Sequence, residues 1–249
     1  MAKRRTWWGN PALRQAIALT EGVGWTPANI TTGAWYDPSD MSTLFQDSAG
    51  TVPVTADNDP VGRINDKSGN GRHATQATDA ARPIFKTSGG LRWIEGNGVG
   101  LFLRAVFTIS QPWERVSAIR QVTWSTGDAV FGATSNVAGL LQQSGVSPDL
   151  RIFSGSGVAA TGEVLGQNQI VTERYNGASS RIAIDNGSYA TGDVGTNVCD
   201  GITFFAREGA VGAYGDVRCY GVVMRAGTMN DANITLLRQY LAVKAGIAL

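Results

Sequence analysis

Histidine and cysteine are almost absent from this chain of 249 residues, which contains one histidine, His73, and two cysteines, Cys199 and Cys219. Two cysteines cannot build a disulfide framework, and neither a CxxC pair nor a His/Cys cluster points to a zinc site. Cys219 falls on the apolar side of an expected strand, which favours a reduced, buried thiol, while a bridge to Cys199 stays open. A lone histidine beside a turn favours a structural role for His73, because acid–base catalysis needs an orienting partner.

Charge is scarce as well. Charged residues make up 16% of the sequence and the net charge is +1, whereas an average soluble domain has roughly 25% charged residues. A net charge this small gives no electrostatic reason to expect nucleic acid as a partner. The sequence has no apolar run of about 18 residues, so it predicts no membrane insertion. The basic N-terminus is followed by neither an apolar core nor a cleavage site, so we expect synthesis in the cytoplasm without a secretory signal.

The motifs of the common enzyme classes are missing. The sequence has no GxSxG elbow, HExxH helix, Walker loop or dinucleotide-binding glycine pattern. Retaining glycosidases need two carboxyl groups about 5 Å apart, which a β-sandwich often supplies from close alternation along one strand. Here the aspartates are mostly turn residues and the glutamates are isolated from one another. The sequence therefore predicts a protein that is not an enzyme, with no catalytic residue and no cofactor.

Two loops and several tryptophans leave room for a bound ligand. The loops at 55–62 and 66–71 offer carboxylate and carbonyl oxygens to calcium, although turns capped by their own Asx side chains explain both loops and are favoured. Aromatic rings can stack on sugars, but most tryptophans stand beside Ile, Val or Phe in strand patterns, which favours core packing. The sequence thus predicts no metal site and leaves the ligand-binding residues unknown. The tryptophans concerned are Trp25, Trp35, Trp93, Trp113 and Trp124.

Glycine is the residue in excess, with 32 copies scattered between short apolar runs. This distribution is typical of many tight turns between short strands. In SSRIAIDNGSYA, the pair Asn186-Gly187 between alternating residues predicts a hairpin with a two-residue type I′ turn. Further along, the alternation places Val217, Cys219 and Val223 on one face of a late strand. The other expected strands lie near 34–37, 61–66, 91–96, 100–107, 114–124, 128–134, 139–144, 150–155 and 201–209.

A helix is predicted at each end of the chain. Near the N-terminus, Asn10-Pro11 suits an N-cap and first helical position, and Gly22 suits the helix end. Near the C-terminus, Asn230 or Asp231 caps a helix that ends at Gly246. Its apolar face carries Ile234, Leu237 and Leu241, with Tyr240 beside them. The predicted organisation is an N-terminal arm, residues 1–32, followed by one all-β sandwich domain, residues 33–249.

Residues 33–85 contain three distinctive groups of residues: Trp35, Tyr36, Asp37, Ser39 and Asp40; Leu44, Phe45, Gln46 and Asp47; and Asp66, Ser68, Gly69, Gly71, His73, Ala74, Thr75 and Gln76. With these groups the stretch resembles the opening of a family of phage and prophage virion proteins, which implies a concanavalin A-like (laminin G-like) jelly roll, and the later segments extend the resemblance to Leu249. The chain departs from the family pattern at 93–101, where an acidic pair is replaced, and this lowers the expectation of a metal there.

The resemblance implies a place on a bacteriophage particle, in the tail, the baseplate or as a capsid decoration. Together with the missing enzyme motifs, it predicts a non-enzymatic structural protein of the virion. We expect it to reside in the virion, to form homo-oligomers and to contact other virion proteins, with the sandwich outward. The alternative is a module that binds a host-surface receptor or glycan. The predicted assembly interface is the basic and aromatic tip of the arm, although the arm could instead pack on its own sandwich. That tip consists of Lys3, Arg4, Arg5, Trp7 and Trp8.

Overall fold

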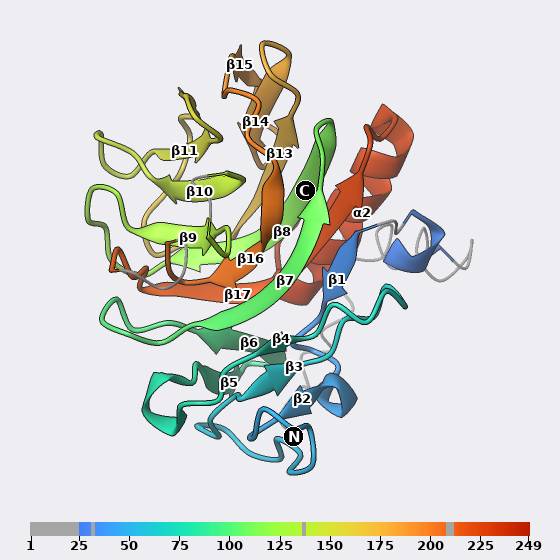
Figure 1. Cartoon of the computed structure of the whole chain (residues 1–249), viewed down its shortest axis with the longest axis vertical. Helices are drawn as coiled ribbons and strands as arrows, with labels where there is room; N and C mark the ends of the chain where they lie inside the picture. Colours follow the sequence, from blue (N-terminus) through green and yellow to red (C-terminus); the bar gives the residue numbers. More distant parts are fainter. Residues whose placement is uncertain (1–24, 31–32, 136–137, 208–211) are drawn as a thin grey trace, which may run out of the picture.

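The structure is a computed structural model that describes residues 25–30, 33–135, 138–207 and 212–249. Two sheets of antiparallel strands face each other, and one helix, α2 (Asp231–Ala245), lies on the outer face of one of them (Figure 1). The predicted fold class, an all-β sandwich with a C-terminal helix, is confirmed. The helix expected in the N-terminal arm lies outside the described residues.

The sheet that carries α2 is called the helix-covered sheet. Its strands run in the order β15-β14-β13-β8-β17-β6-β5, and β1 pairs with β17 on the same edge as β6. β17 is therefore the strand that joins the first strand of the chain to the middle of the sheet. The bounds are β1 Ala34–Tyr36, β5 Ile84–Ser88, β6 Leu91–Glu95, β8 Trp113–Gln121, β13 Gln169–Tyr175, β14 Ser180–Ile184, β15 Ala190–Gly192 and β17 Val217–Ala226.

The opposite sheet is called the open sheet. Its strands run in the order β12-β11-β10-β9-β16-β7-β4-β3-β2, so strands from both halves of the sequence meet at β16 and β7. The bounds are β2 Leu44–Phe45, β3 Arg63–Ile64, β4 Ala74–Thr75, β7 Leu103–Ile109, β9 Ala129–Gly132, β10 Leu140–Gln143, β11 Leu150–Phe153, β12 Gly157–Ala159 and β16 Cys199–Phe204.

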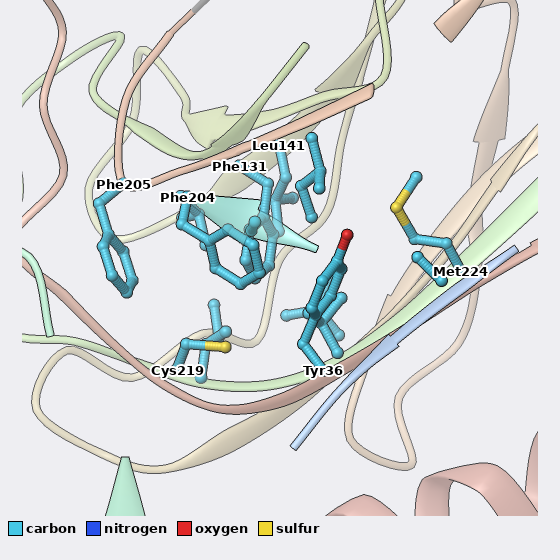
Figure 2. Close-up of a cluster of buried hydrophobic side chains, with 14 of the residues drawn as sticks. Tyr36, Phe131, Leu141, Phe204, Phe205, Cys219 and Met224 are labelled. Carbon is cyan, nitrogen blue, oxygen red and sulfur yellow. The ribbon is translucent and has the colours of Figure 1, made fainter. Parts of the chain in front are cut away.

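The main hydrophobic core lies between the two sheets. Figure 2 shows Phe131 and Phe204 of the open sheet opposite Tyr36 and Met224 of the helix-covered sheet. The rings of Tyr36 and Phe204 meet edge to face, with centroids 5.2 Å apart and planes at 84°. Aromatic pairs favour this geometry because the positive ring edge meets the negative ring face. Both thiols are free and buried, and Cys199 and Cys219 belong to this core.

A second core lies between α2 and the helix-covered sheet. The Asn230 side chain caps the helix by accepting a hydrogen bond from the Asn233 N–H, 2.8 Å long, and Gly246 ends it in the left-handed conformation. Ile234, Leu237 and Leu241 are buried against the sheet, as the sequence pattern predicts. The helix and both of its ends are therefore confirmed, with Asn230 as the cap.

The predicted type I′ turn at Asn186-Gly187 is wrong. β14 pairs with β15 from Ile182 opposite Ala190, which leaves a longer loop between the strands. Asp185 has the positive φ, 46°, and neither residue of the predicted turn does. The reason is a tertiary contact, because Asp185 exchanges hydrogen bonds with the Ile170 backbone of β13, 2.7 and 2.8 Å long. This contact extends the pairing of β14 with β13 by one residue, to Asp185, which is the residue before the predicted turn.

The predicted alternation along β17 is also wrong beyond Cys219. Cys219 pairs with Ile119 and Gly221 with Ala118, so Tyr220 is an extra residue and the register shifts by one. A β-bulge of this kind reverses the faces of the residues that follow it. Val223 consequently packs in the second core under α2, whereas Cys219 packs in the main core.

Residues 25–30, which precede the predicted boundary at residue 32, contact the sandwich domain. Trp25 and Ile30 are buried in the second core, and the Trp25 ring meets Tyr240 of α2 edge to face, with centroids 6.5 Å apart. Residues 25–30 of the predicted arm thus pack on their own domain. In the described part of the chain, no helix has the length and apolar character needed to cross a membrane.

Candidate functional site

Two of the three motifs that carry the family resemblance meet at one buried carboxylate, Asp66. Its Oδ1 accepts hydrogen bonds from the N–H groups of Trp35 and Ser68, each 2.9 Å long. Its Oδ2 accepts from the Ser68 hydroxyl at 2.7 Å and from the Arg72 N–H at 3.1 Å. Asp66 therefore ties the turn at 66–72 to the start of β1. Because all four of these hydrogen bonds lie within the fold, Asp66 serves to hold the sandwich together.

A second carboxylate of the motif, Asp37, connects β1 to the C-terminal helix. It accepts from the Tyr240 hydroxyl at 2.9 Å, and the ammonium of Lys244 lies 3.2 Å away. Burial alone would raise the pKa of Asp37, but Lys244, the Ser39 hydroxyl and Lys67 hold the pKa below its usual value. Asp37 thus stays ionised as a structural anchor between elements from opposite ends of the sequence.

Replacing Asp66 with alanine is expected to lower the free energy of unfolding by about 2 kcal/mol, because the buried Trp35 N–H loses its acceptor. Urea unfolding followed by tryptophan fluorescence measures the change. Asp79→Ala, which removes a carboxylate that is 86% exposed, is the matched control and should change stability by less than about 0.5 kcal/mol. Equal effects of the two variants would contradict the role given to Asp66.

The loops considered for calcium are turns held by their own aspartates. In the loop at 55–62, Asp59 Oδ2 accepts from the N–H groups of Thr55 and Ala56 at 2.8 and 2.9 Å. In the loop at 66–71, Asp66 is occupied as described above. Within the described residues, no group of three or more His, Cys, Asp or Glu side chains is arranged to hold a metal ion.

The outer face of the open sheet has a hollow of about 420 Å³ beside β4 and β7. We call it the β4–β7 pocket. Along β7, Leu103, Ala105, Phe107 and Ile109 point into the core, so the alternate residues point outward and are exposed. Thr75 of β4 pairs with Arg104 of β7 and shares this outer face. The pocket is lined by His73, Thr75, Gln76, Ala77, Phe102, Arg104 and Val106.

The single histidine has a defined proton arrangement in this pocket. His73 Nδ1 accepts a hydrogen bond from the Asp66 N–H at 3.0 Å, so the neutral ring carries its proton on Nε2. Burial lowers the pKa of His73, and the positive charge of Arg63 lowers it further, against a smaller opposing effect of Asp66. The neutral ring is therefore the favoured form near pH 7, with one N–H to donate. The structural role predicted for His73 is compatible with a second role as a hydrogen-bond donor to a ligand in this pocket.

Arg104 provides the strongest free recognition group in the pocket. Its side chain is exposed, and no hydrogen bond or ion pair joins it to any residue that the structure describes. Its five N–H donors are consequently available to a ligand. Close by, Val106 is 73% exposed and offers an apolar surface. Sequence reasoning missed Arg104, although the alternation in LFLRAVF was the available signal that it points away from the core.

A second polar group of interest, the ion pair between Arg115 and Glu173, is sealed inside the sandwich. Both side chains have no exposed surface, and Arg115 Nη2 lies 2.6 Å from Glu173 Oε2. Arg115 also donates to the Gly139 carbonyl at 3.1 Å, which joins the helix-covered sheet to the chain just before β10. Because both groups are fully buried, the pair serves the fold and does not contact a ligand from solution.

The predicted assembly residues lie outside the part of the chain that the structure describes, so that interface stays a prediction. It comprises Lys3, Arg4, Arg5, Trp7 and Trp8.

No family model and no curated protein matches this chain. Solved structures match it with TM-scores above 0.5. The Trypanosoma rangeli sialidase in complex with sialic acid has a TM-score of 0.52 and 11% identity over 84% of this chain. A mutant GH54 α-L-arabinofuranosidase soaked with 4-nitrophenyl α-L-arabinofuranoside has a TM-score of 0.62 and 16% identity over 92% of it. An arabinofuranosidase complexed with arabinofuranosyl-α-1,2-xylobiose has a TM-score of 0.56 and 17% identity over 75%.

The chain spans only part of these proteins, covering 32% of the sialidase, 65% of the GH54 enzyme and 51% of the other arabinofuranosidase. At identities of 17% or less, what the likeness shows is the shared sandwich fold. The three structures are a sialidase and two arabinofuranosidases, which are enzymes that act on carbohydrates.

These matches contradict two predictions made from the sequence, that the chain is a structural protein of a virion and that it is not an enzyme. The virion prediction rested on the motifs in 33–85. Their aspartates hold a turn, a strand and the C-terminal helix together, so these motifs are evidence for the fold and not for a role in a virion. The second rested on missing motifs and on spacing along the sequence. In a sandwich, side chains that share one face come from strands far apart in sequence, so spacing alone was a poor guide.

Proposed function

We propose that this chain binds carbohydrate on the outer face of the open sheet, at the β4–β7 pocket. The observation that carries the proposal is the lining of this pocket. There the guanidinium of Arg104, which has no partner among the described residues, stands beside the exposed side chain of Val106. Sugar rings present hydroxyl groups at their rim and C–H groups on their faces. A site with hydrogen-bond donors next to apolar surface matches both.

The remaining residues of the pocket are suited to the same ligand. The His73 ring offers an N–H donor, and the Thr75 hydroxyl both donates and accepts. Gln76 is held in place, because its Oε1 accepts from the Thr78 N–H at 3.0 Å. The half-buried Phe102 adds an aromatic surface at the rim. The proposal is further supported by two of the matching structures, which are complexes with sialic acid and with arabinofuranosyl-α-1,2-xylobiose.

A glycan array that contains sialylated glycans and neutral arabinoxylan oligosaccharides tests the proposal with the full chain. We expect binding to a defined subset of glycans and a loss of about tenfold or more in affinity on Arg104→Ala, since charge-assisted hydrogen bonds are the strong ones. Arg238→Ala is the matched control. Arg238 lies on α2, which covers the helix-covered sheet, so it is on the opposite side of the sandwich from the pocket. Chromatography of the same glycans after incubation measures whether bound sugars are also cleaved.

Absence of binding to every glycan on the array would overturn the proposal. Binding that survives Arg104→Ala unchanged would place the site elsewhere on the molecule and contradict the assignment of the β4–β7 pocket. Because Arg104 is exposed and has no partner among the described residues, its replacement should leave the unfolding transition unchanged.

A further inference from the structure

The β4–β7 pocket is basic. None of the seven described residues that line it is acidic, and Arg104 and His73 are among them. A second arginine stands on the same outer face, since Arg63 of β3 pairs with Thr75 of β4, which in turn pairs with Arg104 of β7. Adjacent strands lie about 4.8 Å apart, so the two arginines are separated by about 10 Å at the backbone. A row of Arg63, Thr75 and Arg104 therefore crosses the sheet.

Arg63 is held in a fixed position. Its Nε donates to Asn65 Oδ1 at 2.7 Å and its Nη1 donates to the Ala49 carbonyl at 3.1 Å. Both partners are uncharged, so the positive charge of Arg63 is not neutralised by them. Burial is the main cause of the lowered pKa of His73, and the positive charge of Arg63 is the second cause. The second cause is consistent with a positive potential at this face.

Three carboxylates in the turns near β3 and β4 are already held by other groups. Asp66 accepts hydrogen bonds from three residues of its own turn and of β1. Asp79 pairs with Arg82 at 2.6 Å, and Asp47 accepts from the N–H groups of Thr51 and Val52 at 2.9 Å each. The guanidinium of Arg104 thus has no internal counter-ion among the described residues.

We infer that the saccharide bound at the β4–β7 pocket carries a carboxylate, as hexuronic and sialic acids do, and that Arg104 binds this group. The inference rests on the proposed function and names the class of its ligand. The planar guanidinium of arginine matches a carboxylate with two parallel hydrogen bonds. The neutral His73 ring and the Thr75 hydroxyl are placed to meet sugar hydroxyls beside it, and Arg63 adds a second positive charge along the row.

Calorimetric titration of the full chain with a galacturonic acid trisaccharide and with its carboxyl-reduced, neutral counterpart tests the inference. The two probes differ only at the carboxyl groups. We expect the acidic trisaccharide to bind about tenfold or more tightly, with an affinity that falls as salt is added. Arg104→Ala should remove the preference for the acidic trisaccharide. Arg104→Lys should keep only part of this preference, because lysine lacks the planar fork of arginine. Arg63→Ala should weaken the preference. Arg238→Ala is the control.

Equal affinity for the acidic and the neutral trisaccharide, lost on Arg104→Ala, would overturn the inference while leaving the proposed carbohydrate site in place. A preference for the acidic probe that survives Arg104→Ala would overturn the role of Arg104. Tighter binding of a short oligothymidylate than of the trisaccharide would reassign the basic row to nucleic acid and also overturn the inference. If no saccharide of the titration or of the glycan array binds, the proposed function itself fails.

Discussion

Replacing Glu173 with alanine is expected to lower the free energy of unfolding by about 3–5 kcal/mol, because it leaves the buried charge of Arg115 without a partner. A buried lysine could release its proton to escape this cost, but a guanidinium does not deprotonate in proteins. Arg115 is therefore forced either to stay charged in the core or to draw water into it. Both outcomes weaken the contact between the two sheets.

The surroundings of the pair make this loss large. Arg115 Nε lies 2.9 Å from Glu173 Oε1, so the two planar groups meet along two parallel hydrogen bonds. The Tyr175 hydroxyl lies 2.8 Å from Glu173 Oε2 and 3.0 Å from the Leu140 carbonyl of β10. The Tyr175 ring stacks on Trp113, with centroids 4.0 Å apart and planes at 7°. Removal of the carboxylate thus breaks a network that spans both sheets.

Urea unfolding of Glu173→Ala, compared with a double variant Arg115→Met/Glu173→Leu, measures the effect. The double variant should recover most of the lost stability, because an apolar pair of similar volume avoids burying an unpaired charge. An exposed pair provides the matched control, since Asp79→Ala removes a carboxylate from Arg82 at the surface and should cost less than about 1 kcal/mol. A loss of similar size in Glu173→Ala and Asp79→Ala would show that the buried network contributes little.

Stability is expected to fall as the pH rises from 5 to 8, with Glu163 as the main cause. Its side chain is 6% exposed, and its Oε2 has no hydrogen-bond partner among the described residues. Burial is the main cause that raises the pKa of Glu163 from the ordinary value of 4.5 to about 7; the charges of Asp149 and Asp185 act in the same direction, and backbone hydrogen bonds, including that from the Leu150 N–H, act against it. The protonated form is thus the one that suits the fold.

The direction of the pH effect follows from the higher pKa in the native state. Below pH 4.5 the group is protonated in both the native and the unfolded protein, and its favourable contribution is fully present. As the pH rises to about 7, the unfolded protein releases this proton readily while the native protein holds it, so stability declines. A difference of about 2.5 pKa units corresponds to a loss of roughly 3 kcal/mol once the pH exceeds 7.

Glu163→Gln tests this expectation, because the amide stays neutral at every pH. The difference in free energy of unfolding between this variant and the unmodified chain should favour the variant increasingly from pH 5 to pH 8. The control Asp79→Asn makes the same chemical change at an exposed carboxylate and should give a flat difference. A flat difference for Glu163→Gln as well would sink the assignment of the pH effect to this residue.

Local signals were enough to predict the fold class and the ends of the C-terminal helix. The scattered glycines mark turns, and Asn230 and Gly246 supply the cap and the left-handed end within a few residues of the helix they bound. The alternation in β7 is an equally local signal that Arg104 faces away from the core, but no prediction was drawn from it. What such patterns leave open is which strands lie side by side.

The remaining features depend on contacts between residues that lie far apart in the chain, which local patterns do not predict. The pairing of Asp185 with Ile170 replaced the expected turn, and the bulge at Tyr220 reversed the faces of β17. The open sheet brings Arg63 and Arg104, 41 positions apart in the sequence, to either side of Thr75 on one exposed face. Pairing partners in a sheet are selected by burial of whole faces, which spacing along a single strand does not encode.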